Sequence, residues 1–138
     1  MLVAKEFVWN MSHRLMAHSG LCKNIHGHTY KLRIIFDGAI DLDGMVLDYY
    51  EIGSIVQPVV DLLDHAFMCE AADNLMKEFL GTNGFKHIII QIEPTAENIC
   101  SWFADQLVPK FQEYKNLFSM KIRVYETSDT YAEIEVAL

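Results

Sequence analysis

The sequence predicts an α+β domain in which an antiparallel sheet carries two main helices on one face. Alternating apolar and polar residues near both ends of the chain favour strands, and apolar residues at helical spacing occupy two segments between them. The 138 residues suit a single domain, residues 1–138, that is long enough to bury a sizeable core. We therefore expect a hairpin, a helical middle and a second hairpin.

The first two strands are predicted over residues 5–13 and from His26 to about Phe36. Side chains on a strand alternate between its two faces, so each strand places an apolar row on one face. The histidines at 13, 26 and 28 continue these rows. The apolar members of the rows are Phe7, Trp9, Met11, Tyr30, Leu32, Ile34 and Phe36.

The middle of the chain is predicted to be mainly helical. Apolar residues recur at helical spacing between Ile52 and Leu63, although Pro58 should kink or split that helix. Residues 70–84 hold a shorter helical pattern, and residues 86–93 are typical of a short strand. This part of the chain connects the two hairpins.

A second main helix is predicted to begin at Thr95, a residue type that commonly caps helices, with Glu97 in the first turn. Strands over residues 119–126 and 131–138 close the chain, joined by the polar turn 127–130. The core stripe of the helix would be Ile99, Trp102, Phe103, Leu107 and Phe111.

Composition and charge exclude several classes of protein. The formal net charge is −8 and no basic patch is present, which argues against a nucleic-acid partner. No apolar stretch approaches the roughly 18 residues that suggest a membrane span, and the N-terminus lacks an export signal. Three cysteines are too few for a disulfide scaffold, so we expect a reducing, cytoplasmic environment.

Three histidines indicate a metal site. A single histidine on a core face is usually a hydrogen-bonded core residue, but His26 and His28 lie together at the mouth of one face. If the first two strands pair as a hairpin, His13 lies across the ladder from them, about 5 Å away. Three imidazoles without a fourth protein ligand form the open zinc site that is used in catalysis.

Six short motifs follow one another along almost the whole chain, from about Phe7 to the C-terminus. They are Ser12-His13-Arg14-Leu15, Cys22-x-x-x-His26-Gly27-His28-x-Tyr30, Gly44-Met45-Val46-x-Asp48, Leu63-Asp64-His65, Pro94-Thr95-x-Glu97-Asn98 and Val124-x-Glu126-Thr127. In this order they resemble the 6-pyruvoyltetrahydropterin synthase superfamily. The three-residue gap after Cys22 is similar to the bacterial 6-carboxytetrahydropterin synthase branch, which acts in queuosine and 7-deazaguanine biosynthesis.

The resemblance implies a fold and an assembly. It implies the tunnelling fold, in which subunits join their sheets into a barrel, here as a homo-hexamer built from two trimers. Four strands with unprotected outer edges are a problem that such an assembly would solve. The resemblance also implies that Cys22 and the Asp64-His65 pair serve one substrate from different subunits, so that the sites lie at subunit interfaces.

The resemblance further implies a reaction. A zinc-dependent lyase of carbon–oxygen and carbon–carbon bonds would convert 7,8-dihydroneopterin triphosphate to 6-carboxytetrahydropterin, acetaldehyde and triphosphate. Zinc would be held by the three histidines at 13, 26 and 28. Arg14, Lys23 and Lys31 are candidates to meet the triphosphate, or are simply solvated.

The remaining site residues each have two interpretations. Glu126 is either a solvated strand end or, as the resemblance implies, the anchor of the pterin's amino-pyrimidine edge. Thr95 and Glu97 either build the same pocket or only cap their helix. Asp64 and His65 are either a helix end or a proton-transfer pair.

Cys22 is predicted to be reactive, because a nearby zinc and Lys23 would stabilise its thiolate. In contrast, we expect Cys69 and Cys100 to be small buried apolar residues. Together, Cys22 and the Asp64-His65 pair are the predicted catalytic residues.

Three alternatives stay open at this point. The product could be the pyruvoyl compound, since Trp9-Asn10-Met11-Ser12 and the segment from Ala66 to Gly84 depart from the usual family pattern. The chain could also be a non-catalytic zinc- or pterin-binding oligomer in which Cys22 is idle. An aldolase-type pterin enzyme without zinc is the third, and the histidine set counts against it.

Overall fold

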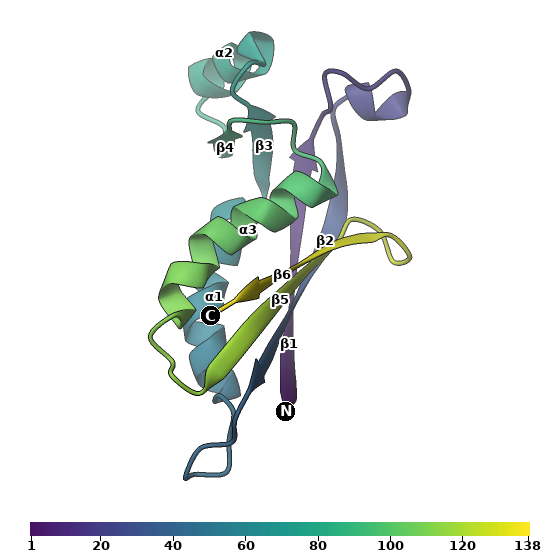
Figure 1. The fold of residues 1–138 in the computed structure, drawn as a ribbon. Coiled ribbons are helices and arrows are strands. Elements are labelled where there is room, and N and C mark those ends of the chain that lie inside the picture. The colour runs from purple at the N-terminus through teal and green to yellow at the C-terminus, as the bar shows by residue number, and fades with distance from the viewer.

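The computed structural model describes all 138 residues as one mixed sheet of six strands with two helices packed on it (Figure 1). The strands are β1 (Leu2–His13), β2 (His26–Gly38), β3 (Ala66–Glu70), β4 (His87–Ile90), β5 (Leu117–Tyr125) and β6 (Tyr131–Ala137). The helices are α1 (Tyr49–Leu63), α2 (Asn74–Asn83) and α3 (Ala96–Phe111), with a short 3-10 helix η1 over Leu21–Lys23. The strand order is β4-β3-β1-β2-β5-β6.

The main core lies between the sheet and the helices α1 and α3. The alternate residues of β1, β2 and β5 that face the helices are buried, in the rows that the sequence predicts. Trp9 stacks on Tyr30 with ring centroids 5.2 Å apart, and Phe103 of α3 meets Trp9 edge-on at 5.5 Å. The two main helices therefore cover one face, which is the face on which the predicted metal ligands lie.

Most of the predicted elements are confirmed, with boundaries shifted by a few residues. The predicted split of α1 at Pro58 is wrong, because α1 is a single helix. Pro58 lies on the exposed side of α1. Buried residues before and after it hold both halves of the helix against the core, and these are Ile52, Val56, Val59, Val60 and Leu63.

The sheet is mixed, which corrects the prediction of an antiparallel sheet. β3 pairs in parallel with β1 and with β4, while β1, β2, β5 and β6 are joined by antiparallel pairings. The residues of β3 show no alternation of apolar and polar types, because Ala66–Cys69 are all buried. Met68 packs in the main core, whereas Phe67 packs in a small cluster with α2. Strands covered on both faces lose the period of two.

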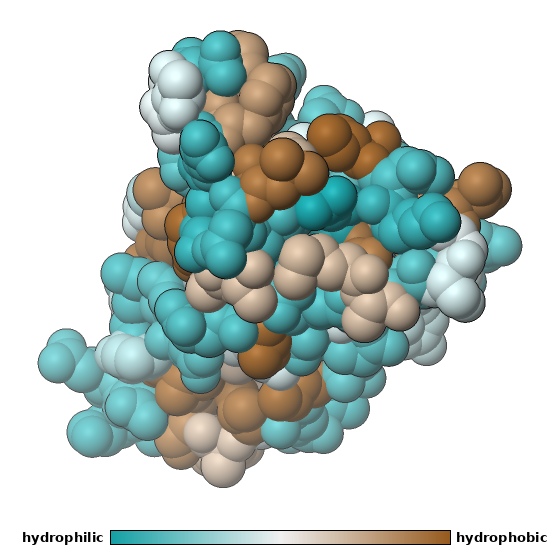
Figure 2. All heavy atoms as spheres, turned by 90° about the horizontal axis from the view of Figure 1, so that it is seen from above, coloured by the Kyte–Doolittle hydropathy of each residue, from teal (hydrophilic) through white to brown (hydrophobic).

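β3, α2 and β4 form a βαβ unit at one end of the molecule (Figure 1), and we call residues 66–90 the α2 lobe. The loop between β1 and β2, residues 14–25, lies at the same end, because β3 pairs with the last residues of β1. Figure 2 looks down on this end and shows a mainly hydrophilic surface with hydrophobic side chains in separate groups. In a single chain, both the loop and the α2 lobe therefore meet solvent.

The sheet has two open edges. β6 is the last strand on one side, and β4 is the last on the other. Because β1 pairs with β3 only over Met11–His13, residues 2–10 of β1 also lack a neighbouring strand on the β4 side. Such edges are available for pairing with another chain, although the joining of sheets into an oligomeric barrel stays a prediction. None of the helices is long and apolar enough to cross a membrane.

Candidate metal centre and active site

The three predicted ligands meet at the end of the β1–β2 hairpin. The register pairs His13 with His26 and Met11 with His28, and paired residues lie on the same face of an antiparallel sheet. The ring centroids are 4.6 Å apart for His13 and His26, 5.4 Å for His13 and His28, and 5.1 Å for His26 and His28. The predicted convergence is therefore present in a single chain.

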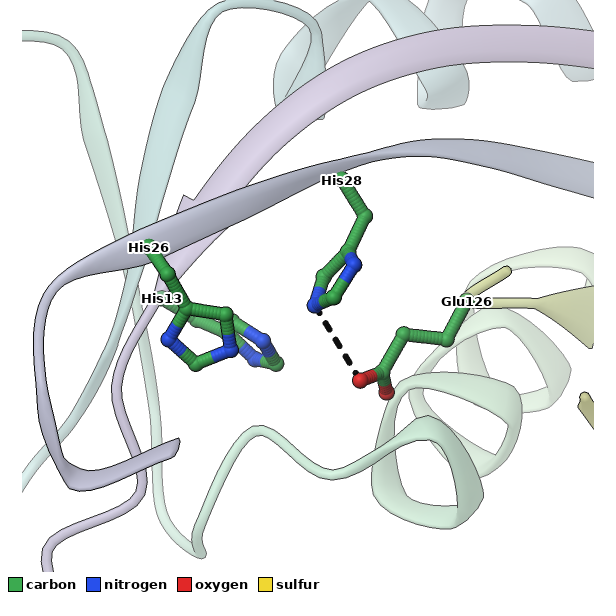
Figure 3. Close-up of side chains that lie close together, drawn as sticks. All are labelled: His13, His26, His28 and Glu126. Atoms are coloured by element: carbon green, nitrogen blue, oxygen red, sulfur yellow. Dashed lines mark ion pairs between the residues drawn. The ribbon is translucent and has the colours of Figure 1, made fainter. Parts of the chain in front are cut away.

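Glu126 joins this cluster from β5, directly after the last residue of that strand. Its Oε1 lies 3.1 Å from Nε2 of His28, and Figure 3 shows the carboxylate pointing toward that ring. One ligand atom from each of the four residues lies within 4.8 Å of the others. Glu126, which the sequence analysis predicts to anchor a pterin, thus lies next to the imidazoles.

The ring nitrogens of the histidines are arranged to bind a metal. Nδ1 of His13 lies 2.7 Å from the carbonyl oxygen of Pro94, and Nδ1 of His26 lies 2.8 Å from that of Asn24. A carbonyl oxygen only accepts, so each Nδ1 carries the proton and each Nε2 keeps its lone pair. Nε2 of His26 is buried without a hydrogen bond, as expected for a metal ligand whose other nitrogen is held by the protein. Nε2 of His28 is buried as well, and its polar neighbour is the Glu126 carboxylate.

Burial keeps His13 in the protonation state that a ligand needs. The residue has 0% of its surface exposed, and desolvation is the main reason why its pKa falls to about 4. The proximity of the two other imidazoles, which repel a positive charge on His13 whenever they carry one, lowers this pKa further. His13 is therefore neutral near pH 7, with Nε2 available to a cation.

Tyr30 is a member of the site that the sequence analysis treated only as core. Its hydroxyl oxygen lies 3.3 Å from Nε2 of His13. Burial raises the pKa of Tyr30, and the negative charges of Glu126 and Cys22 raise it further. The buried phenol of Tyr30 therefore stays protonated, and it lies close enough to Glu126 and Cys22 for a negative charge on either to raise its pKa.

Cys22 lies in η1, within the β1–β2 loop, and is half-buried. Its carbonyl oxygen accepts a hydrogen bond of 2.9 Å from the Leu15 amide, which closes the loop on itself. Cys69 and Cys100 are buried, as predicted, and burial raises the pKa of each thiol. Cys22 is thus the one accessible thiol of the chain.

The Asp64-His65 pair is formed as predicted. Oδ2 of Asp64 lies 2.8 Å from Nδ1 of His65, and the Asn10 amide donates a 3.0 Å hydrogen bond to Oδ1 of Asp64. These two hydrogen bonds, the backbone one first, hold the pKa of Asp64 below its ordinary value. The His65 amide donates to the Asn10 carbonyl at 2.7 Å, and this tie holds His65 at the positive φ of 58°.

The structure does not bring this pair to the imidazoles of the same chain. His65 borders a hollow of about 440 Å³ whose lining includes Asn10, Thr29 and also His28, which lies between Gly27 and Thr29 on β2. The Thr29 hydroxyl donates to the Asn10 side chain at 2.8 Å, so both point to one face of the sheet. Along β1 and β2, the side chains of Asn10 and Thr29 point to the face opposite to that of His13 and His28. The hollow next to His65 therefore opens on the face of the sheet away from the imidazole rings.

Thr95 and Glu97 lie at the start of α3. The Thr95 hydroxyl oxygen accepts a 3.3 Å hydrogen bond from the Asn98 amide, which confirms the cap. The Glu97 side chain is exposed in the first turn. Their contribution to a pterin pocket stays a prediction, and the residue before them, Pro94, is the one that contacts His13.

Two of the three candidate phosphate-binding cations have protein partners. Arg14 forms an ion pair with Asp73, and Lys31 lies 4.2 Å from the ring centroid of Tyr125 and 3.7 Å from Glu6. The Arg14 guanidinium is therefore bound to a carboxylate of the protein itself, so the interpretation of Arg14 as a simply solvated residue is wrong.

Comparison with known proteins places the chain in a family. The family model described as 6-pyruvoyl tetrahydropterin synthase matches residues 2–137, nearly the whole chain. The chain belongs to the 6-pyruvoyl tetrahydropterin synthase family. This confirms the family predicted from the six motifs and, with it, a pterin synthase as the class of enzyme.

Similar proteins support the same assignment. A Haemophilus influenzae protein named 6-carboxy-5,6,7,8-tetrahydropterin synthase is 33% identical over 141 residues, covering 96% of this chain and 97% of that protein. A Rickettsia felis protein of the same name is 30% identical, with 94% and 96% covered. The structure of Plasmodium falciparum 6-pyruvoyl tetrahydropterin synthase has 19% identity and a TM-score of 0.79, covers 100% of this chain and 98% of that chain, and shares the fold.

Replacing His28 with Ala should strip the protein of zinc. Removing one imidazole leaves too few strong donors for an ion that prefers four ligands. Elemental analysis should find about one zinc per wild-type chain and almost none in the variant. The matched control is His87→Ala, because His87 is exposed on β4 outside the cluster and its loss should leave zinc unchanged. Full zinc occupancy in His28→Ala contradicts the assignment.

Replacing Glu126 with Gln separates two roles that its position allows. As the pterin anchor, the carboxylate makes charge-assisted hydrogen bonds, and the variant should bind pterin more weakly by about 1.5–3 kcal/mol with zinc content unchanged. If Glu126 is instead a zinc ligand, zinc affinity falls as well. Calorimetric titrations with pterin and with zinc distinguish these outcomes, and Glu78→Gln, an exposed site on α2 with the same charge change, is the control.

Proposed function

We propose that this chain is a zinc-dependent 6-carboxy-5,6,7,8-tetrahydropterin synthase acting in the cytoplasm. With the consumption of one water molecule, it would convert 7,8-dihydroneopterin triphosphate to 6-carboxytetrahydropterin, acetaldehyde and triphosphate, a step in queuosine and 7-deazaguanine biosynthesis. The observation that carries the proposal is the cluster of three imidazoles and one carboxylate in a member of this family. The names of the relatives at 33% and 30% identity support the carboxy product.

His13, His26 and His28 would hold the zinc through their Nε2 atoms. When bound, zinc supplies a Lewis acid that acidifies protons next to the oxygens it polarises. Glu126 would accept hydrogen bonds from the amino-pyrimidine edge of the pterin. Because its Oε1 lies 3.1 Å from His28, an anchored pterin has its side chain close to the three imidazoles.

Two groups of the protein would move protons. The Cys22 thiolate would take a proton from a carbon of the substrate side chain, and His65, held by Asp64, would deliver or accept the second one. The 2.8 Å contact with Asp64 fixes the proton of His65 on Nδ1 and leaves Nε2 for the substrate. The side chain of His65 is 76% exposed in the single chain, so Nε2 is accessible from outside.

The two halves of this site would come from different chains. Within one chain, His65 and the imidazoles lie on opposite faces of the β1–β2 ladder, so a substrate held at the imidazoles needs the His65 of a neighbour. The open edges of β1 and β6 are suited to sheet extension between subunits. We propose the homo-hexamer of two trimers on this basis.

Identifying the product tests the proposal directly. Zinc-loaded protein incubated with dihydroneopterin triphosphate should release acetaldehyde and form 6-carboxytetrahydropterin, both identified by mass spectrometry. A pyruvoyl product without acetaldehyde would assign the chain to the other branch of the family. Pterin binding without turnover, together with unchanged Cys22 alkylation on adding zinc, would identify a non-catalytic binding protein.

Mixing two inactive variants tests the shared site. Cys22→Ala keeps a functional His65, and His65→Ala keeps a functional Cys22, so reassembled mixtures should contain some complete sites. Activity should return in proportion to the number of mixed interfaces and depend on the mixing ratio. The control is the double variant mixed with either single one, which should restore nothing. If mass spectrometry shows subunit exchange but activity stays absent, the pocket lies within one chain.

A further inference from the structure

The ion pair between Arg14 and Asp73 joins the metal centre to the α2 lobe. Nε and Nη2 of Arg14 donate to the two carboxylate oxygens of Asp73 at 2.6 and 2.7 Å. The Asp73 side chain is only 3% exposed. The same carboxylate accepts the Met76 amide at 3.1 Å and so caps α2. A bidentate pair with one nearly buried partner is a rigid link, unlike an exposed ion pair.

The position of this link matters because β1 ends at His13. His13 is the last residue of β1 that pairs with β2, opposite His26, and also the last that pairs with β3, opposite Met68. Terminal pairs of a ladder open more readily than interior ones. Arg14 is the next residue, so its ion pair with Asp73 restrains the backbone directly after the last paired residue of β1.

The link also reaches the loop that carries Cys22. Leu15 follows Arg14 and donates its amide to the Cys22 carbonyl at 2.9 Å. The Ala17 amide donates to the Glu93 carboxylate at 2.5 Å, one residue before the Pro94 carbonyl that holds the His13 ring. The start of the loop is therefore fixed between the α2 lobe and the beginning of α3.

We propose that Arg14 and Asp73 are positioning residues of the zinc site, which hold the end of β1 so that His13 and Cys22 keep their places. This inference rests on the proposed zinc site, and it gives the α2 lobe a function as the support of that site. Neither residue belongs to the cluster of possible metal ligands, and in this proposal both act through the backbone of their neighbours.

Two variants remove the ion pair from either side. Asp73→Asn takes away the charge but keeps the helix cap, because Asn caps as well as Asp, and Arg14→Gln removes the guanidinium. Zinc affinity, measured by competition with a chromogenic chelator, should fall roughly 10- to 100-fold in each, as is usual for residues that support metal ligands. The double variant should lose no more than a single one, since all three lack the same pair.

A second measurement needs neither zinc nor activity. In the metal-free wild type, hydrogen exchange at the Leu15 amide should be slow, and it should speed up at least tenfold in Asp73→Asn. The matched control is Glu133→Gln, which breaks the Arg123–Glu133 pair, also 2.6 Å long but outside the metal centre. The control should change neither the exchange at Leu15 nor zinc affinity.

The outcomes separate this inference from the proposed function. If wild type and variants bind zinc within twofold of one another, the ion pair is structural only and the inference is overturned while the zinc site stands. If the wild type binds no zinc, the proposed metal site fails and the inference fails with it. If Arg14→Gln does not fold, Asp73→Asn and the exchange at Leu15 still decide the outcome.

Discussion

The register between β1 and β2 is the constraint on which the rest of the structure depends. Twelve successive residue pairs join the two strands, from Leu2 with Asp37 to His13 with His26. A slip of one residue would move His13 to the other face, away from His26 and His28. No tight turn sets this register, since residues 14–25 separate the strands. The apolar rows restrict it, because a slip of one residue would turn one of the two rows away from α1 and α3.

The candidate metal centre is therefore a continuation of the core. The stacked pair Trp9 and Tyr30 is followed by the buried Met11, which pairs with His28, and then by His13, which has no exposed surface. Burying neutral imidazoles costs free energy unless their nitrogens are bonded. The carbonyls of Pro94 and Asn24 satisfy one nitrogen of His13 and of His26, and they leave the other nitrogen of each for an ion. The core thus fixes where the rings lie, and the backbone carbonyls fix which atom faces the site.

The sequence predicted those parts of the molecule that have a local signal. Alternation located β1, β2, β5 and β6, helical spacing located α1 and α3, and the shared face of the first two strands located the three histidines. It could not locate β3, whose residues are buried on both sides, nor the parallel pairing of β3 with β1, which joins distant segments without a turn. The partners of His13 and Arg14 were missed for the same reason. The Pro94 carbonyl and the Asp73 carboxylate are 81 and 59 residues away from them in the sequence. The spacing of apolar residues along the chain does not predict contacts between such distant residues.

The candidate catalytic groups are divided between the two faces of the β1–β2 ladder. The β1–β2 ladder stands between His65 and the imidazoles, and no change of side-chain rotamer can cross a hydrogen-bonded sheet. Asp64 and His65 are also held by the backbone N–H and C=O of Asn10, on the side of β1 where no strand pairs with this residue. The residue that holds the pair thus lies three residues before His13 on the same strand. A displacement of β1 would therefore move His13 of the histidine cluster and the support of the Asp64-His65 pair together, since one strand carries both.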